Sequence, residues 1–208
     1  MTKRELALRV LISQIGVHEQ SGTNRGPVVD EYQRADTLPG EGYAWCMSLQ
    51  QWCWRTATGG ELLADGTAGC ATFYDWARRS GFLVDRPLRG DHVVFDLDRD
   101  GQYDDHVGMI ERVLRLGPVL LLQTIEGNTS PDDRGSQADG GGVRRKRRVV
   151  RRRTVAFVRI PGEAPEGGIE VPRPKRPGGV RGLAFGLRRA PSGIVYTEPA
   201  PRGEPVGT

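Results

Sequence analysis

The chain has 208 residues and a mass of 22.9 kDa, which is enough for one ordinary domain with its own core. Its residues are 37% hydrophobic and 27% charged, which argues against wholesale disorder. No segment approaches the roughly 18 apolar residues of a membrane helix, and charges at Lys3, Arg4 and Glu5 interrupt the first apolar segment. We therefore expect neither a membrane partner nor a signal peptide, and a protein made in the cytoplasm.

The net charge of +4 is unevenly distributed. Positions 144–153, which we call the basic strip, hold eight basic residues and no acidic one, and without them the net charge is −4. The eight are Arg144, Arg145, Lys146, Arg147, Arg148, Arg151, Arg152 and Arg153. The strip is either a solvated loop or strand edge, or a site that attracts a polyanion. A nucleic-acid partner ranks last, because such binders usually interleave aromatic residues with the basic ones.

Helical patterns fill the first part of the chain. Leu6, Val10 and Leu11 repeat at helical spacing, and Pro27 suits the first turn of a short helix. Gly81 is placed to end the last of these helices. The helices are predicted at 3–15, 28–35, 44–57 and 70–80.

After Pro87 the hydrophobic pattern changes to alternation, which predicts β-strands. The strands are predicted at 92–97, 106–114, 119–127 and 154–160. Helices followed by antiparallel strands indicate an α+β fold, with the N-terminal helices packed on the sheet. Residues 163–208 contain 9 Gly and 8 Pro, which predicts a largely disordered tail after a single domain over 1–162.

The three cysteines argue against a disulfide framework and a structural zinc site, because they are an odd number without a CxxC pair. Cys46 lies at the predicted start of a helix, where the helix dipole and free N–H groups favour the thiolate. It is therefore a candidate nucleophile. Cys53 and Cys70 are interpreted as core residues.

A hairpin supplies a partner for this cysteine. If the turn between the second and third predicted strands is a three-residue loop centred on Leu116, His106 lies directly opposite Glu126 on the same face. A carboxylate in that position orients the imidazole and stabilises its charged form. Asn128 follows on the same face if the strand continues. A register slip of one residue would separate the pair.

Four ordered motifs resemble the CHAP family of peptidoglycan hydrolases, within the NlpC-type papain-like superfamily. They are GVHEQSGTNRGPVVDEY, PGEGYAWCMSLQQWC, GDHVVFDLDRDGQYDDHVGMIERV and TIEGNTS, between residue 16 and about residue 130. The resemblance implies a papain-like fold, closed by the strand near 154–160. It also implies Cys46 as the nucleophile, His106 as the base, Glu126 as the residue that orients it, and Asn128 as a further polar active-site residue.

The implied reaction is acyl transfer to Cys46 followed by hydrolysis of a thioester. The substrate is then an amide of bacterial peptidoglycan, either the N-acetylmuramoyl-L-alanine bond or a peptide cross-link, and the protein a monomeric phage lysin. It would act on the cell wall after release or as a virion component. The basic strip would then contact anionic wall polymers. Asn24 and Arg25 either line the substrate groove or form a capped turn.

The acidic loop before His106 resembles the first part of an EF-hand calcium loop. Its candidate Ca²⁺ ligands are Asp96, Asp98, Asp100, Gln102 (through its carbonyl) and Asp104. The bidentate glutamate expected at the twelfth position is missing, because Val107 is there. The alternative is a solvated acidic turn. No organic cofactor is expected.

Two other functions remain open at this stage. The first is a papain-like hydrolase that acts on a protein or a small amide. The second is a non-catalytic module that binds polyanions through the basic strip, for which binding would fall steeply with salt and would not need Cys46.

Overall fold

The computed structural model describes residues 1–20, 22–116, 119–131, 136–150, 154–166, 169, 171–172, 185–189 and 195–199. The chain divides into two units, Met1–Lys175 and Arg176–Thr208. The first unit carries all the residues considered for a site. Among the described residues, no helix is both long and apolar enough to cross a bilayer.

The predicted helices all form, and local signals set their ends. They are α1 (Lys3–Ser13), α2 (Pro27–Gln33), α3 (Cys46–Thr58) and α4 (Cys70–Arg79), with a short 3-10 turn at Ala64–Gly66. Thr2 and Glu5 form a reciprocal capping box at the start of α1. Gly59 takes the left-handed conformation that ends α3, where a side chain would be strained.

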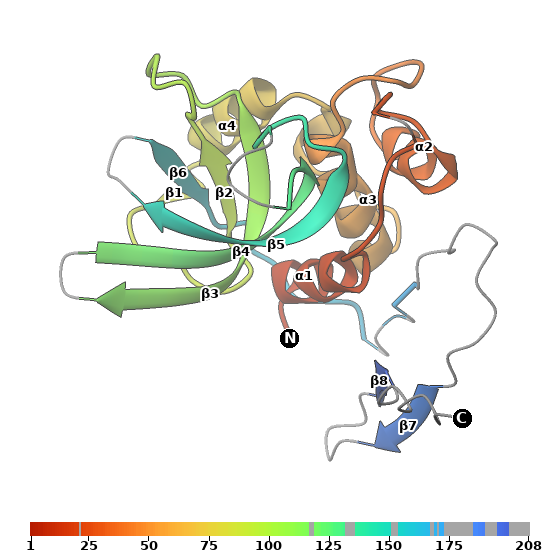
Figure 1. Cartoon of the computed structure of the whole chain (residues 1–208). Coiled ribbons are helices and arrows are strands. Elements are labelled where there is room, and N and C mark those ends of the chain that lie inside the picture. The colour runs from red at the N-terminus through yellow and green to blue at the C-terminus, as the bar shows by residue number, and fades with distance from the viewer. Residues whose placement is uncertain are drawn as a thin grey trace, which may run out of the picture. The chain divides into compact units, whose positions relative to one another are not determined.

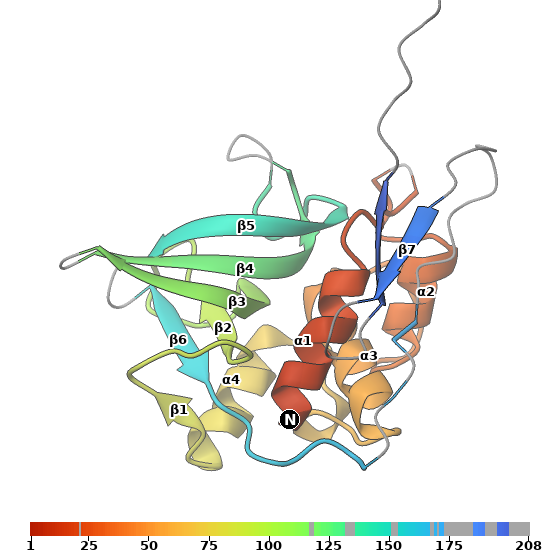
Figure 2. The same cartoon turned by 90° about the horizontal axis from the view of Figure 1, so that it is seen from below.

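The described strands of the first unit form one six-stranded sheet, in the order β1-β6-β2-β3-β4-β5, and every pairing is antiparallel. They are β1 (Leu83–Val84), β2 (His92–Phe95), β3 (His106–Leu116), β4 (Val119–Thr129), β5 (Gly142–Val150) and β6 (Val155–Val158). The helices gather to one side of this sheet, while the far ends of β3 and β4 extend away from them (Figures 1 and 2). The predicted α+β architecture is confirmed.

Alternation along β2 divides the core in two. Val94 packs with the helices in the main core, whereas Val93 and Phe95 belong to a smaller cluster. Helix α3 contacts both β3 and β4. Gly127 makes this approach possible, because a Cβ atom there would collide with Leu49 of α3. The helix that begins with Cys46 is thus held directly against the strand that carries Glu126.

Strand β5 was not predicted, because its basic residues hid its strand character. The structure places Arg144–Arg148 in this strand, paired with β4, and positions 151–153 of the basic strip lie outside the described residues. The pairing with β4 is possible because several of these side chains find acceptors within the domain.

The segment after residue 162 begins inside the first unit. The Ala164 N–H donates to the Met1 carbonyl (2.9 Å), and the Ser13 hydroxyl donates to the Pro172 carbonyl (3.0 Å). In the second unit, β7 (Phe185–Arg189) pairs antiparallel with β8 (Val195–Pro199). Most of the remaining tail lies outside the described residues, so its predicted disorder stays a prediction.

Candidate active site

Cys46 is the first residue of α3, and only 5% of the residue is exposed. A residue in this position has a backbone N–H with no acceptor inside the helix. The positive end of the helix dipole also favours a negative charge on its sulfur. The site is therefore built to hold a thiolate and to offer a hydrogen-bond donor beside it.

His106, the first residue of β3, connects this sulfur to a carboxylate. Its Nε2 atom lies 3.0 Å from Oε2 of Glu126, and both residues are fully buried. Its Nδ1 atom makes no hydrogen bond within the described structure, and the ring as a whole interacts with the Cys46 thiol. Long or misaligned contacts of this kind are common before substrate binds. The Phe95 ring packs against the imidazole at a centroid distance of 5.8 Å.

The hairpin register differs from the prediction. Glu126 pairs with Gly108, not with His106. The last residue of β3, Leu116, pairs with the first residue of β4, Val119. A bulge between Ile110 and Arg112 also shifts the pairing. Because the error at His106 is two residues, an even number, the two side chains still share a face. The predicted register, with His106 directly opposite Glu126, was wrong, but the two side chains are in contact as predicted.

Arg148 of β5 holds Glu126 from the other side, and the sequence analysis did not assign it this role. Its Nε donates to Oε1 (2.9 Å) and its Nη2 to Oε2, so the guanidinium grips both carboxylate oxygens. Its guanidinium carbon lies 5.2 Å from the centroid of the Phe95 ring. The Thr124 hydroxyl also donates to Oε1. The signal that could have identified this role is the alternation of side chains along a strand, which places every second residue of the basic strip on the same face of the sheet.

These contacts shift the pKa of each group in the chain. Burial would raise the pKa of Glu126, but hydrogen bonds from Arg148 and His106 outweigh it and lower the pKa to about 2. Burial would lower the pKa of His106, but the contacts with Cys46 and Glu126 outweigh it and raise the pKa to about 9. The arrangement therefore favours an imidazolium between two anions.

Cys70, interpreted from the sequence as core, is the nearest sulfur to Cys46. The two Sγ atoms are 3.6 Å apart, and Cys70 is the first residue of α4. A hydrogen bond from Cys70 is the largest cause that lowers the pKa of the Cys46 thiol, ahead of the opposing effect of burial and the contact with His106. The same bond raises the pKa of Cys70. These opposite shifts in pKa favour Cys70 as the thiol that donates and Cys46 as the sulfur that accepts.

Asn128 is fully buried, and its amide is engaged by the loop before β5. Its Nδ2 donates to the Asp139 carboxylate (3.2 Å), and its Oδ1 accepts from the Gly141 N–H (3.3 Å). Its φ of 53° is unusual for a residue other than glycine. These contacts hold the end of β4, and the role of Asn128 in catalysis stays a prediction.

Asn24 and Arg25 form a turn beside α2. Arg25 makes a two-point ion pair with Asp30, whose oxygens lie 2.9 and 3.3 Å from its guanidinium nitrogens. The Asn24 N–H donates to Glu19 (3.1 Å), which also accepts from the indole N–H of Trp45. The turn is therefore tied to the residue that precedes Cys46, while its contact with substrate stays a prediction.

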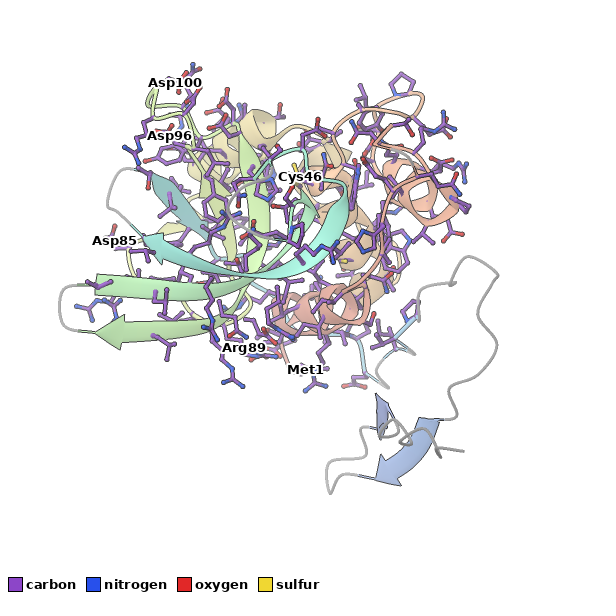
Figure 3. All side chains as sticks on the ribbon, in the orientation of Figure 1. Met1, Cys46, Asp85, Arg89, Asp96 and Asp100 are labelled. Carbon is purple, nitrogen blue, oxygen red and sulfur yellow. The ribbon has the colours of Figure 1, made fainter. Side chains whose placement is uncertain are left out.

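The acidic loop gathers a different set of carboxylates from the one predicted. Asp96, Asp98 and Asp105 each offer an oxygen within 4.8 Å of the others. Asp100 is instead occupied by the backbone and side chain of Gln102, and Asp104 is not part of the group. Figure 3 shows Asp96 and Asp100 on a loop that projects beyond the strands, apart from Cys46. One oxygen of Asp96 is buried without a hydrogen-bond partner, as an open ligand position would be.

An open hollow of about 640 Å³ is lined by residues that precede α3 and α4, although neither Cys46 nor Cys70 lines it. Its lining includes Ala44, two residues before Cys46, and Gly69, directly before Cys70. Tyr43, Trp76 and Arg79 supply aromatic and charged walls. Concave surfaces of this size are common ligand sites, so the hollow is a candidate place for substrate near the starts of α3 and α4.

Residues 38–128 match the family model of the CHAP domain. The matched segment contains Cys46, His106, Glu126 and Asn128, together with the acidic loop and much of the wall of the hollow. No curated protein and no solved structure matches the chain.

Proposed function

Because this chain carries a CHAP domain, a module with amidase or peptidase activity on peptidoglycan, we propose that it cleaves a cell-wall amide with Cys46 as nucleophile. The observation that supports the proposal most is the buried series of contacts from Cys46 through His106 to Glu126. A cysteine at a helix start, an imidazole and an orienting carboxylate are what acyl transfer through a thioester requires.

In the proposed mechanism, the Cys46 thiolate attacks the amide carbon. The Cys46 N–H, free at the start of α3, then donates to the oxygen on which charge develops. His106 gives its proton to the departing amine, which leaves a thioester and a neutral imidazole. That imidazole next takes a proton from a water molecule, whose oxygen attacks the thioester and releases Cys46. Glu126 holds the ring and stabilises its charged form in both steps.

We further propose a phage-lysin role, in which the protein reaches the cell wall after release from the producing cell or as part of a virion. The substrate strand would lie in the hollow lined by Ala44 and Gly69, which precede Cys46 and Cys70 in the chain. Both the N-acetylmuramoyl-L-alanine bond and a peptide cross-link are amides, and the same residues would cleave either.

Calcium binding by the acidic loop is a separate part of the proposal. Carboxylate oxygens are the ligands that Ca²⁺ prefers, and Asp96, Asp98 and Asp105 converge within the required range. The Asp105 carboxylate also accepts from the N–H groups of Leu97 and Asp98, so the loop is already folded around it. A bound ion would neutralise this acidic group, which adjoins His106 in the chain.

The proposal is tested by digestion of purified peptidoglycan, followed by mass analysis of the fragments. The wild-type protein is expected to release fragments whose new ends identify the bond. Cys46→Ala is expected to release none, although it should remain folded. Cys53→Ala, the same substitution two turns along α3, is the matched control and should remain active. Release of the same fragments by Cys46→Ala, or none by the wild type, would refute the proposal.

A further inference from the structure

Two of the three cysteines lie beside each other in the fold. Cys46 and Cys70 begin α3 and α4, and their sulfurs are 3.6 Å apart although 24 residues separate them in the chain. All three cysteines are free thiols or thiolates in the structure, and both members of the pair are buried. Amide hydrolysis requires only one nucleophilic sulfur, so Cys70 stabilises the Cys46 thiolate but does not itself react in the proposed mechanism.

We propose that Cys46 and Cys70 are a redox pair that a peroxide converts into a disulfide. A disulfide bond is about 2.05 Å long, so the two sulfurs need to approach by roughly 1.5 Å. Each cysteine is the first residue of its helix, so its backbone N–H has no acceptor inside the helix and the chain before it is a loop. Cys53 lies two turns further along α3 and is fully buried, which makes it the internal comparison.

The two sulfurs have different starting states, which sets the order of the chemistry. Cys46 is the sulfur held toward the thiolate, because Cys70 and His106 both stabilise its charge. The Cys46 thiolate attacks one oxygen of hydrogen peroxide, the O–O bond breaks, and hydroxide leaves, which gives a sulfenic acid. The Cys70 thiol then attacks the Cys46 sulfur, its proton joins the departing hydroxyl, and water leaves. Two electrons pass from the sulfurs to one peroxide, and a thiol reverses the change by exchange.

Disulfide formation has a consequence for activity that rests on the proposed function. A disulfide leaves no thiolate at Cys46, so the oxidised protein would not attack an amide. It would also protect the sulfur from sulfinic and sulfonic acids, which thiols do not reduce. Cys70 would thus make oxidation of the site reversible.

The direct test measures the bond and does not depend on activity. The protein is treated with hydrogen peroxide, unfolded, and its free thiols are titrated; we expect the count to fall from the three of the sequence to one. The intact mass should fall by two hydrogen atoms. Dithiothreitol should restore all three thiols.

The position of the bond follows from a digest. Trypsin leaves Cys46 and Cys53 together in one fragment, 35–55, and Cys70 in another, 56–78. The digest is therefore made on Cys53→Ala, in which only Cys46 can link the two fragments. A linked 35–55/56–78 species supports the proposal. If both the wild type and Cys53→Ala gain oxygen atoms on their cysteines but give no linked 35–55/56–78 species, the proposal is overturned.

Cys70→Ser tests the resolving role with activity as the readout. Peroxide-treated wild type should regain its peptidoglycan hydrolysis after dithiothreitol, whereas treated Cys70→Ser should gain oxygen atoms at Cys46 and stay inactive. Equal recovery in both would contradict the role of Cys70. If neither untreated protein hydrolyses peptidoglycan, the proposed function fails, while the thiol and mass measurements still decide the redox pair.

Discussion

Arg148→Met removes the cation that balances a buried carboxylate. Glu126 is fully buried, and the Arg148 side chain is 13% exposed, so water replaces little of the lost interaction. Two charges about 4 Å apart interact by about 4 kcal/mol at an effective dielectric constant of about 20. Loss of one partner from a buried pair costs about 3–5 kcal/mol by mutational experience. We therefore expect Arg148→Met to lower the free energy of unfolding by about 3–5 kcal/mol.

The matched control is Arg145→Met, the same change on the same strand. Arg145 also grips a carboxylate with two bonds, to Glu111, but its side chain is 44% exposed. Because water reaches the Arg145 end of this pair, although the Glu111 side chain is only 10% exposed, this variant should lose less stability than Arg148→Met. Urea unfolding followed by tryptophan fluorescence gives both free energies. An equal loss in the two variants would show that burial of the Glu126 pair does not set its strength.

Arg148→Met is also expected to change the pH dependence of kcat/KM. In the wild type, hydrogen bonds from Arg148 and His106 hold the pKa of Glu126 at about 2, below the working range. Without Arg148, burial raises that pKa, so Glu126 becomes protonated as the pH falls and the imidazolium loses its support. The acid limb of kcat/KM should therefore move to higher pH in Arg148→Met and stay unchanged in Arg145→Met. An unmoved acid limb in a folded Arg148→Met would refute the reasoning.

Three further results are expected. The alkaline limb of kcat/KM should fall with an apparent pKa of about 9, because His106 then loses the proton that the leaving amine needs; a plateau through pH 10 would contradict this. Glu126→Gln should lower kcat roughly 10²–10⁴-fold and move that limb to lower pH, as a titration of activity will show. Ca²⁺ should raise the melting temperature of the wild type and of Asp104→Asn but not of Asp105→Asn, and equal shifts in all three would exclude the observed cluster.

Local patterns in the sequence were enough for most of the fold. Helix starts and ends depend on residues a few positions apart, such as Thr2 with Glu5, and these are visible in one dimension. Cys46 at a helix start and the shared face of His106 and Glu126 were likewise local inferences. The exact register was not, because no local pattern in the sequence marks the bulge between Ile110 and Arg112.

What the sequence did not reveal are the partners from distant parts of the chain. Cys70 lies beside Cys46 only because α3 and α4 bring their first residues together, and no spacing rule predicts that. The presence of Asp105 instead of Asp104 in the acidic cluster likewise depends on how the loop folds back on itself. The EF-hand spacing assumes a standard loop, whereas here Asp105 accepts from the backbone of Leu97 and Asp98 and is turned inward.

The basic strip shows why a run of charges is a poor guide to a binding partner. As a sequence it was compatible with a solvated strand edge or with a site for a polyanion, yet in β5 several of its side chains contact the domain itself. Arg148 grips Glu126, Arg145 grips Glu111, and the buried Lys146 ammonium donates to the Ser130 carbonyl. A charge used in this way is no longer available to a polymer in solution, and its removal changes stability and catalysis before it changes binding. Charge reversal at the exposed Arg147 would measure electrostatic attraction to the wall, whereas the same change at Arg148 would measure the state of Glu126.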